Sequence, residues 1–461
     1  MLTFRDSRAR FGRRAFLRAG ALSLGGLSLP GLLAHAAADP KRLLSGRSVI
    51  FLFLHGGPSQ FETFDPKMAA PAGIRSSTGE IQTSIPGVTF GSTFPKLAQL
   101  ADRLAIVRSF TTGDANHDIK PVVSRHTHGA NLGSLFARAA GATDPATGMP
   151  RTALLFPRAV DATAGAEQTQ FGRFGSTGAV GAGYAPFVPG TGGNLQQDMQ
   201  LNLPLDRIAD RRRLLTELDR VRYSHDATSP TGAIDKLREQ AFTSVLGGVA
   251  QAFDLSREEP AVIERYDTAP LVRPDQIDRK WNNYPHYVDN AKSLGKLLLL
   301  ARRLCEAGCG FVTVTTNFVW DMHADVNNAT CAEGMRYTAP PLDHAVAALV
   351  EDLAERGLSE RILLVCCGEM GRSPRLNSEG GRDHWGNLAP LLLAGGGLRM
   401  GQVIGQSTRD GSQPQSEPVG IPNLVATILQ RLVDPGELRI VRGMPNDVVQ
   451  PATAEPIAGL I

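Results

Sequence analysis

The sequence predicts an α/β protein whose mostly parallel sheet is flanked by helices, and two observations lead to this fold class. Helix-like and strand-like segments alternate along most of the chain of 461 residues. The strand-like segments are continuous apolar runs, which is typical of strands buried on both faces. With 42% hydrophobic and 20% charged residues, the chain has the composition of a globular protein with a sizeable core.

The elements can be assigned in chain order from these patterns. The run SVIFLFL at 48–54 is the first strand, and a helix-like stretch at 93–103 precedes the short strand LAIVRS. A helix predicted at 289–308 ends in glycine and precedes the strand FVTVTT at 311–316. A helix at 338–357, with proline near its start and glycine at its end, precedes the strand RILLVCC. This alternation favours a parallel sheet with helices on both faces.

The segment 141–280 interrupts the alternation. It is rich in glycine and proline around FGRFGSTGAVGAGYAPFVPGTGGN, and it becomes strongly helical at DRIADRRRLLTELDRVR. Its glycines neither follow a strand nor open a helix, so the pattern is not a dinucleotide-binding fingerprint. We predict one domain over 39–461, in which 141–280 is a cap inserted over the edge of the sheet.

The first 38 residues have the features of an export signal. Arg13 and Arg14 precede Phe16 and Leu17, an apolar segment follows, and small residues close the stretch at 34–38. Paired arginines before such a segment are typical of a twin-arginine signal peptide. The sequence therefore predicts a periplasmic or secreted protein that uses the twin-arginine translocase as a partner.

Charge and cysteine content exclude two further classes. Residues 1–38 hold six arginines and one aspartate, so their removal would take the 48 basic and 45 acidic residues to 42 and 44. A chain of nearly balanced charge shows no bulk attraction to nucleic acid, and we predict no such partner. The five cysteines are an odd number without metal-site spacing, so neither a disulfide framework nor a zinc-cysteine site is expected.

Ionisable side chains follow several predicted strands directly. His55 comes after the first strand, His117 after LAIVRS, Asp321 and His323 after FVTVTT, and Glu369 after RILLVCC. Ligands bind at the carboxyl ends of the strands in open parallel sheets. Imidazoles and carboxylates gathered there form the ligand set of a zinc, manganese or iron site. The alternative is that these residues are polar turn residues or helix caps.

The stretch GEMGRSPRLNSEGGRDHW at 368–385 is predicted to be a loop between two buried strands. Its His384 is a further candidate metal ligand, and Asp383 is either another ligand or a carboxylate that orients His384. Arg372 and Arg382 are candidates for binding a phosphate or sulfate oxyanion, because guanidinium groups bind such anions through two hydrogen bonds. Both arginines could equally be solvated surface charges.

Ser59, in the turn HGGPSQ, has two readings. Its hydroxyl is either a catalytic nucleophile or a helix N-cap, and we favour the cap because serine is a preferred N-cap residue.

Four blocks carry a resemblance to a known family: VIFLFLHGGPSQFETFDPK, ARRLCEAGCGFVTV with WDMH, GEMGRSPRLNSEGGRDHW, and APLLLAGGGLRMGQVIGQS. The chain resembles the DUF1501 family of exported bacterial proteins, which is similar to the alkaline phosphatase and sulfatase superfamily. The resemblance implies an alkaline-phosphatase-like fold and a divalent metal such as zinc, manganese or calcium. It also implies that Asp321 and His323 match a metal-binding pair, that Glu369 stands at the next ligand position, and that His384 resembles the last histidine ligand.

Two functional hypotheses follow. The first is a periplasmic metal-dependent hydrolase of phosphate or sulfate esters, acting on small molecules or polysaccharides. The second is a non-catalytic exported scaffold that binds a metal, a polysaccharide or an envelope protein. The clustered candidate ligands favour the first hypothesis. Two departures from the superfamily favour the second: His55 stands where an aspartate ligand is expected, and no nucleophile motif matches.

Overall fold

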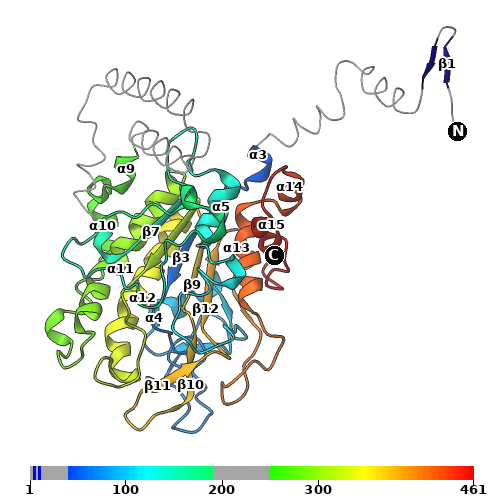
Figure 1. Cartoon of the computed structure of the whole chain (residues 1–461). Coiled ribbons are helices and arrows are strands. Elements are labelled where there is room, and N and C mark those ends of the chain that lie inside the picture. Colours follow the sequence, from blue (N-terminus) through cyan, green and yellow to red (C-terminus); the bar gives the residue numbers. More distant parts are fainter. Residues whose placement is uncertain (1–3, 7–8, 12–39, 191–248) are drawn as a thin grey trace.

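A seven-stranded sheet forms the centre of the molecule (Figure 1). The computed structural model describes residues 4–6, 9–11, 40–190 and 249–461. The strand order is β13-β6-β12-β9-β3-β8-β7. The strands are β3 Ser48–Phe53, β6 Ala105–Val107, β7 Thr152–Leu155, β8 Phe311–Thr315, β9 Ile362–Cys367, β12 Leu391–Gly395 and β13 Gln402–Ile404.

The sheet is mostly parallel, as predicted. Strands β7, β8, β3 and β9 pair in parallel, and so do β6 and β13. Strand β12 alone among the seven runs antiparallel to its neighbours β6 and β9. Its position between them leaves the remaining six strands pointing in one direction, so their carboxyl ends meet at one end of the sheet.

Both faces of the sheet are covered by helices, which explains the continuous apolar runs. Alternate residues of β3 enter different cores: Val49 and Phe51 lie in one, and Ile50 and Leu52 lie in the other. One face carries α11 Tyr284–Glu306, α12 Cys331–Glu355 and α4 Pro95–Gln99. The opposite face carries α5 Leu132–Ala140, α13 Ile421–Leu432 and α15 Asn446–Ala452.

The remaining elements are short. The helices are α3 Pro40–Leu43, α9 Ala250–Phe253, α10 Pro260–Tyr266 and α14 Pro435–Ile440. Strands β4 Glu80–Gln82 and β5 Thr89–Gly91 form one small ladder, and β1 Phe4–Asp6 and β2 Ala9–Phe11 form another. No helix in the described part of the chain is long and apolar enough to cross a membrane.

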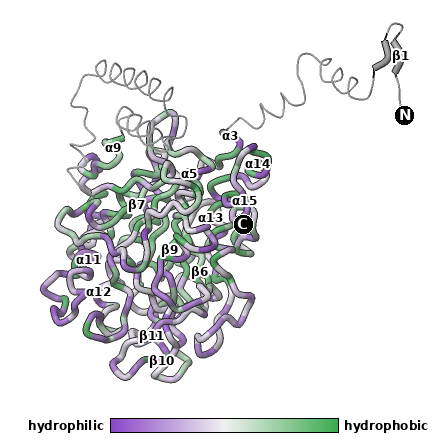
Figure 2. Tube along the Cα trace, viewed as in Figure 1, coloured by the Kyte–Doolittle hydropathy of each residue, from purple (hydrophilic) through white to green (hydrophobic). Residues whose placement is uncertain are grey.

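The stretch predicted as a loop at 368–385 is a two-stranded hairpin instead. Strand β10 Gly371–Leu376 pairs antiparallel with β11 Arg382–Trp385, and Arg372 lies opposite His384. The pairing register shifts between Arg372 and Leu376, and Pro374 lies within that irregular part. Proline and charged residues conceal such a strand from sequence patterns, because they are tolerated only at sheet edges and bulges. The hairpin lies at the lower end of the molecule, where the chain is coloured mainly neutral to hydrophilic (Figure 2).

Two other predicted boundaries are corrected. Helix α12 begins at Cys331 rather than at 338, with the Thr330 side chain capping its first turn, so Pro340 and Pro341 lie inside it. The helix-like stretch at 93–103 is divided into α4 and a 3₁₀ turn, Ala101–Arg103.

The predicted cap and signal lie partly outside the described residues. Within 141–280, strand β7 is the edge strand of the main sheet. This part of the segment therefore belongs to the central fold and is not an inserted cap. Residues 191–248 of the predicted cap lie outside the described residues. So does the predicted export signal at 1–38, apart from β1 and β2.

Candidate metal centre

The carboxyl ends of three adjacent parallel strands supply the frame of the site. Strand β3 leads into His55 and Gly56, the neighbouring strand β8 leads to Asp321 and His323, and β9 leads to Glu369. Two further segments reach the same end: His117 follows β6, and His384 lies on β11. The fold therefore joins segments that are far apart in the sequence.

Four side chains gather closely enough to share one metal ion. Each offers one ligand atom, and these atoms all lie within 4.8 Å of one another: His117, Asp321, His323 and His384. The Nε2 atoms of the three histidines lie 3.3, 3.0 and 3.4 Å from Oδ1 of Asp321, in that order. The Nε2 atoms of His323 and His384 are 2.7 Å apart. Three imidazoles and one carboxylate make a ligand set that suits a divalent transition metal.

Asp321 is held in place by donors on both of its oxygens. Arg372 Nη2 donates to Oδ1 at 2.6 Å, and Asn328 Nδ2 donates to Oδ2 at 3.1 Å. Burial alone would raise the pKa of this carboxyl group, but the Arg372 charge and the histidine hydrogen bonds outweigh it. The pKa of Asp321 is consequently held well below its usual range, and the group is ionised.

His117 is clamped between two acidic residues and two aromatic rings. Its Nδ1 lies 2.9 Å from Oε1 of Glu369, while its Nε2 faces Asp321 without a hydrogen-bond partner in the described residues. The rings of Phe171 and Phe318 lie 4.9 and 4.8 Å from its ring centre. Burial lowers the pKa of His117, but the nearby carboxylates of Asp321 and Glu369 raise it more, so the net shift is upward.

The pKa of His384 moves the other way. Burial lowers it first, and the neighbouring positive charge of Arg372 lowers it further, against the hydrogen bond with Asp321. A lowered pKa keeps this imidazole neutral near pH 7, which is the form that binds metals.

Glu369 lies behind His117 rather than in the group of four. Its side chain is fully buried, and the Gly56 amide donates to both oxygens, at 3.0 and 3.3 Å. The sequence predicts Glu369 as a metal ligand, whereas in the structure its carboxylate contacts His117 and the Gly56 amide.

The two arginines assigned to oxyanion binding are both occupied by protein groups. Arg372 is 1% exposed and donates to backbone carbonyls of Gly56, Gly57 and Arg382 as well as to Asp321. Arg382 is fully buried and forms an ion pair with Glu62, with 3.0 Å between Nε and Oε2. Each guanidinium group is therefore engaged by protein groups, and Arg372 Nη1 also lies 3.2 Å from His323 Nε2 in the cluster.

The other candidates lie at the margin of the cluster. The Ser59 hydroxyl donates to Glu62 and accepts from the Phe61 amide, so it neither caps a helix nor faces the metal candidates. The Asp383 side chain is 70% exposed. The imidazole that its carboxylate approaches is that of His323, with 3.7 Å between Oδ1 and Nδ1.

His55 points into an aromatic cage instead of the cluster. Its ring centre lies between 5.0 and 5.8 Å from those of Phe53, Phe171, Phe174 and Phe318. Burial lowers the pKa of His55 to about 4, so the imidazole is neutral. Its carbonyl accepts hydrogen bonds from the amides of Val319 and Trp320, which ties the β3 turn to the Asp321 segment.

Sequence patterns missed three contributors to this site: Asn328, Phe171 and Phe318. Asn328 lies in a polar turn seven residues after Asp321, and an asparagine there is typical of a turn alone. In the sequence, the two glycines after His55 are the signal that another backbone segment packs closely against this turn. A Cβ atom on Gly56 would lie 2.6 Å from the Asp321 amide nitrogen.

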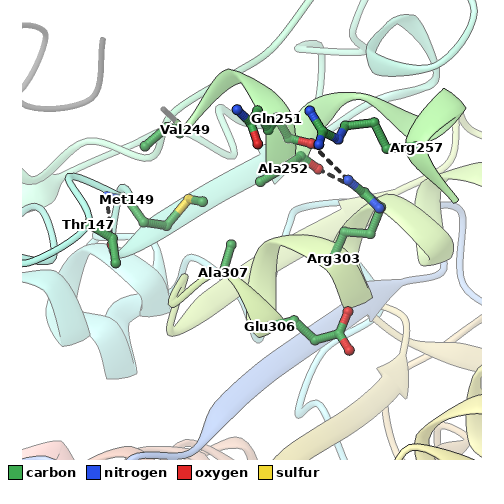
Figure 3. A pocket seen from close by; sticks show the side chains of 9 residues that line it. All are labelled: Thr147, Met149, Val249, Gln251, Ala252, Arg257, Arg303, Glu306 and Ala307. Atoms are coloured by element: carbon green, nitrogen blue, oxygen red, sulfur yellow. Dashed lines mark hydrogen bonds between the residues drawn. The ribbon is translucent and has the colours of Figure 1, made fainter. Parts of the chain in front are cut away.

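A separate pocket lies at the opposite end of the sheet. Its volume is about 450 Å³, and it is lined by Thr147, Met149, Val249, Gln251, Ala252, Arg257, Arg303, Glu306 and Ala307 (Figure 3). Arg303 already donates to the carbonyls of Ala252 and Gln251. These lining residues surround the end of α11 that precedes β8, whereas Asp321 follows the carboxyl end of β8.

Several solved structures have a distant likeness to this chain. A sulfatase, PsFucS1 from Pseudoalteromonas sp., is 12% identical with a TM-score of 0.31; the match covers 87% of this chain and 69% of that one. The phosphonate monoester hydrolase of Agrobacterium radiobacter is 9% identical with a TM-score of 0.34, covering 84% and 74%. The corresponding enzyme SpPMH from Silicibacter pomeroyi is 12% identical with a TM-score of 0.29, covering 89% and 76%. Because these identities and TM-scores are low, the chemistry of the cluster is argued from its own residues and geometry.

The search of curated proteins found no match. The family model described as "Protein of unknown function (DUF1501)" matches residues 46–450, which is most of the chain. The chain therefore belongs to the DUF1501 family.

Proposed function

We propose that this protein is an exported, metal-dependent hydrolase of phosphate or sulfate esters. The observation that carries the proposal is the convergence of three imidazoles on one oxygen of Asp321. It is supported by Nε2 of His117, a buried polar atom that faces the carboxylate and has no hydrogen-bond partner among the described residues. A buried acceptor or donor without a partner is costly, and a bound cation would satisfy this one.

The donor set narrows the choice of metal. Three imidazole nitrogens with a carboxylate oxygen suit zinc, and manganese is the second choice. Calcium prefers six to eight oxygen ligands, so this nitrogen-rich cluster disfavours it. His117, His323 and His384 would supply three zinc ligands, and Asp321, held by hydrogen bonds from Arg372 and Asn328, would lie beside the ion and leave a fourth position open. Three protein ligands with an open position are the arrangement of catalytic zinc sites.

The protein's own residues have defined parts in this proposal. A bound divalent cation would polarise an ester oxygen and make water a better nucleophile near neutral pH. Arg372 and Asn328 fix the ionised Asp321 carboxylate beside the imidazoles. The side chains of His323 and His384 are 23% and 29% exposed, against 11% for His117, so an ester would approach from their side.

Loss of one candidate ligand should separate a working site from an incidental cluster. His384→Ala should weaken zinc binding by more than about a hundredfold, because changing even an outer partner of a ligand costs about 10- to 100-fold. Metal content would be measured by mass spectrometry, and turnover would be measured on aryl phosphates and aryl sulfates with added zinc, manganese or calcium. His126→Ala is the matched control, since His126 contacts Arg125 on a separate 3₁₀ turn.

A second candidate function rests on the occupied arginines and on Ser59. With both guanidinium groups and this hydroxyl engaged by the protein, the cluster could serve an exported scaffold that binds metal, polysaccharide or an envelope protein. Zinc-loaded wild-type protein without turnover on any ester would support this candidate and contradict the hydrolase.

Export by the twin-arginine translocase to the periplasm is part of the proposal, on the basis of Arg13, Arg14 and the apolar segment after them. The double change Arg13→Lys with Arg14→Lys should leave uncleaved protein in the cytoplasm. Cell fractionation followed by immunoblotting measures this. The matched control is Arg8→Lys, outside the pair, which should be exported normally. Periplasmic accumulation of the double variant at the wild-type level would contradict the assignment.

A further inference from the structure

We propose that Glu369 is a positioning residue that sets the proton and the rotation of His117, so that His117 Nε2 is presented to the metal. This inference rests on the proposed metal site and deepens it. It also assigns Glu369 a role other than that of a ligand.

The geometry of the pair supports this role. Glu369 Oε1 lies 2.9 Å from His117 Nδ1, a distance suited to a hydrogen bond donated by the ring. A proton held on Nδ1 leaves the lone pair of a neutral imidazole on Nε2. That nitrogen faces the anionic Asp321 Oδ1 at 3.3 Å, an arrangement that favours a positive charge on Nε2, supplied by a proton or by a metal ion.

Glu369 is itself rigidly held. It is fully buried, and the Gly56 amide donates to both of its oxygens, so the carboxylate has little freedom to rotate. Phe171 and Phe318 pack on the His117 ring and restrict its rotation. A carboxylate behind a histidine in this way fixes the ring orientation and makes the ligand more basic.

Asp383, whose carboxylate lies on the Nδ1 side of His323, provides a comparison for Glu369. Asp383 Oδ1 lies 3.7 Å from His323 Nδ1, beyond hydrogen-bonding distance, and its side chain is 70% exposed. Solvent screens such a contact, so this carboxylate should contribute little to orienting its histidine.

A double-mutant cycle tests the pairing of Glu369 with His117. Glu369→Gln keeps an acceptor for the Gly56 amide and should weaken zinc binding by about 10- to 100-fold, measured by competition with a chromophoric chelator. In the His117→Ala background, the same change should alter zinc affinity by less than about twofold, since the ring that it positions is gone. Asp383→Asn, the matched control, should also change affinity by less than about threefold.

The outcomes separate this inference from the proposed function. Wild-type protein that binds zinc while Glu369→Gln binds it equally well would overturn the inference alone. The inference alone would also be overturned if Glu369→Gln weakened zinc binding in the His117→Ala background as much as it does in the wild-type protein. Wild-type protein that binds no zinc, manganese or calcium would overturn both, because no cation would then be positioned.

If the Glu369→Gln variant does not fold, a measurement on the wild-type protein tests the same inference. Histidine labelled with ¹⁵N reports the proton positions in long-range ¹H–¹⁵N spectra, and the His117 signal is assigned as the one missing from His117→Ala. We expect Nδ1 to keep its proton and Nε2 to shift when zinc is added. Loss of the Nδ1 proton when zinc binds would overturn the inference.

Discussion

Gly56→Ala is expected to destabilise the protein by about 2–6 kcal/mol and to weaken zinc binding by at least about tenfold. The new Cβ atom would lie 2.6 Å from the Asp321 nitrogen and 2.8 Å from the Trp320 nitrogen. Gly56 also has a φ of +115°, which other residues rarely adopt. The estimate combines backbone strain of about 1–3 kcal/mol with a similar overpacking cost.

The effect on zinc follows from what the Gly56 turn holds. Its amide anchors Glu369 and its carbonyl accepts from Arg372, so pushing the turn away from Asp321 disturbs both sides of the cluster. Unfolding in urea and chelator competition measure the two effects. Gly181→Ala is the matched control, because Gly181 has a φ of +95° but an added Cβ would meet no atom of the described residues within 4 Å. Equal stability and equal zinc affinity in the two variants would contradict the prediction.

Glu62→Ala is expected to lower the free energy of unfolding by about 3–5 kcal/mol, the usual cost of leaving one partner of a buried ion pair alone. The side chains of Glu62 and Arg382 are both fully buried, with 3.0 Å between Oε2 and Nε. Glu62 also accepts hydrogen bonds from Ser59 and Ser77. Its removal would leave a buried positive charge and several unsatisfied donors.

An exposed ion pair supplies the comparison for this prediction. Glu355 is 59% exposed and pairs with Arg265 at 2.6 Å, so Glu355→Ala should cost less than about 1 kcal/mol. Urea unfolding with linear extrapolation gives both values. A Glu62→Ala cost no larger than that of Glu355→Ala would contradict the prediction. Because Arg382 begins β11, which carries His384, the loss should also reduce metal binding.

The strands were predictable because burial on both faces leaves a direct trace in the sequence. Residues 49–54 supply alternate side chains to two separate cores, so every position must be apolar and the run is continuous. The β10–β11 hairpin leaves no such trace. Its two strands form a sheet separate from the central one, and Pro374 lies in an irregular register. Its form depends on contacts of Arg372 and Arg382 with distant segments.

The amino-acid sequence by itself determined the family, the α/β class, and which imidazoles and carboxylates follow strand ends. Strand ends are local features, so His117, Asp321 and His323 could be named without coordinates, and His384 could be named from the resemblance of its segment to the family. Only the tertiary structure decided how these side chains are used. Arg372 and Arg382 look identical to free surface arginines until Asp321 and Glu62 are brought to them across 51 and 320 residues. Glu369 likewise lies behind His117 because a buried charge is oriented by the partners that folding supplies, and those partners lie far away in sequence.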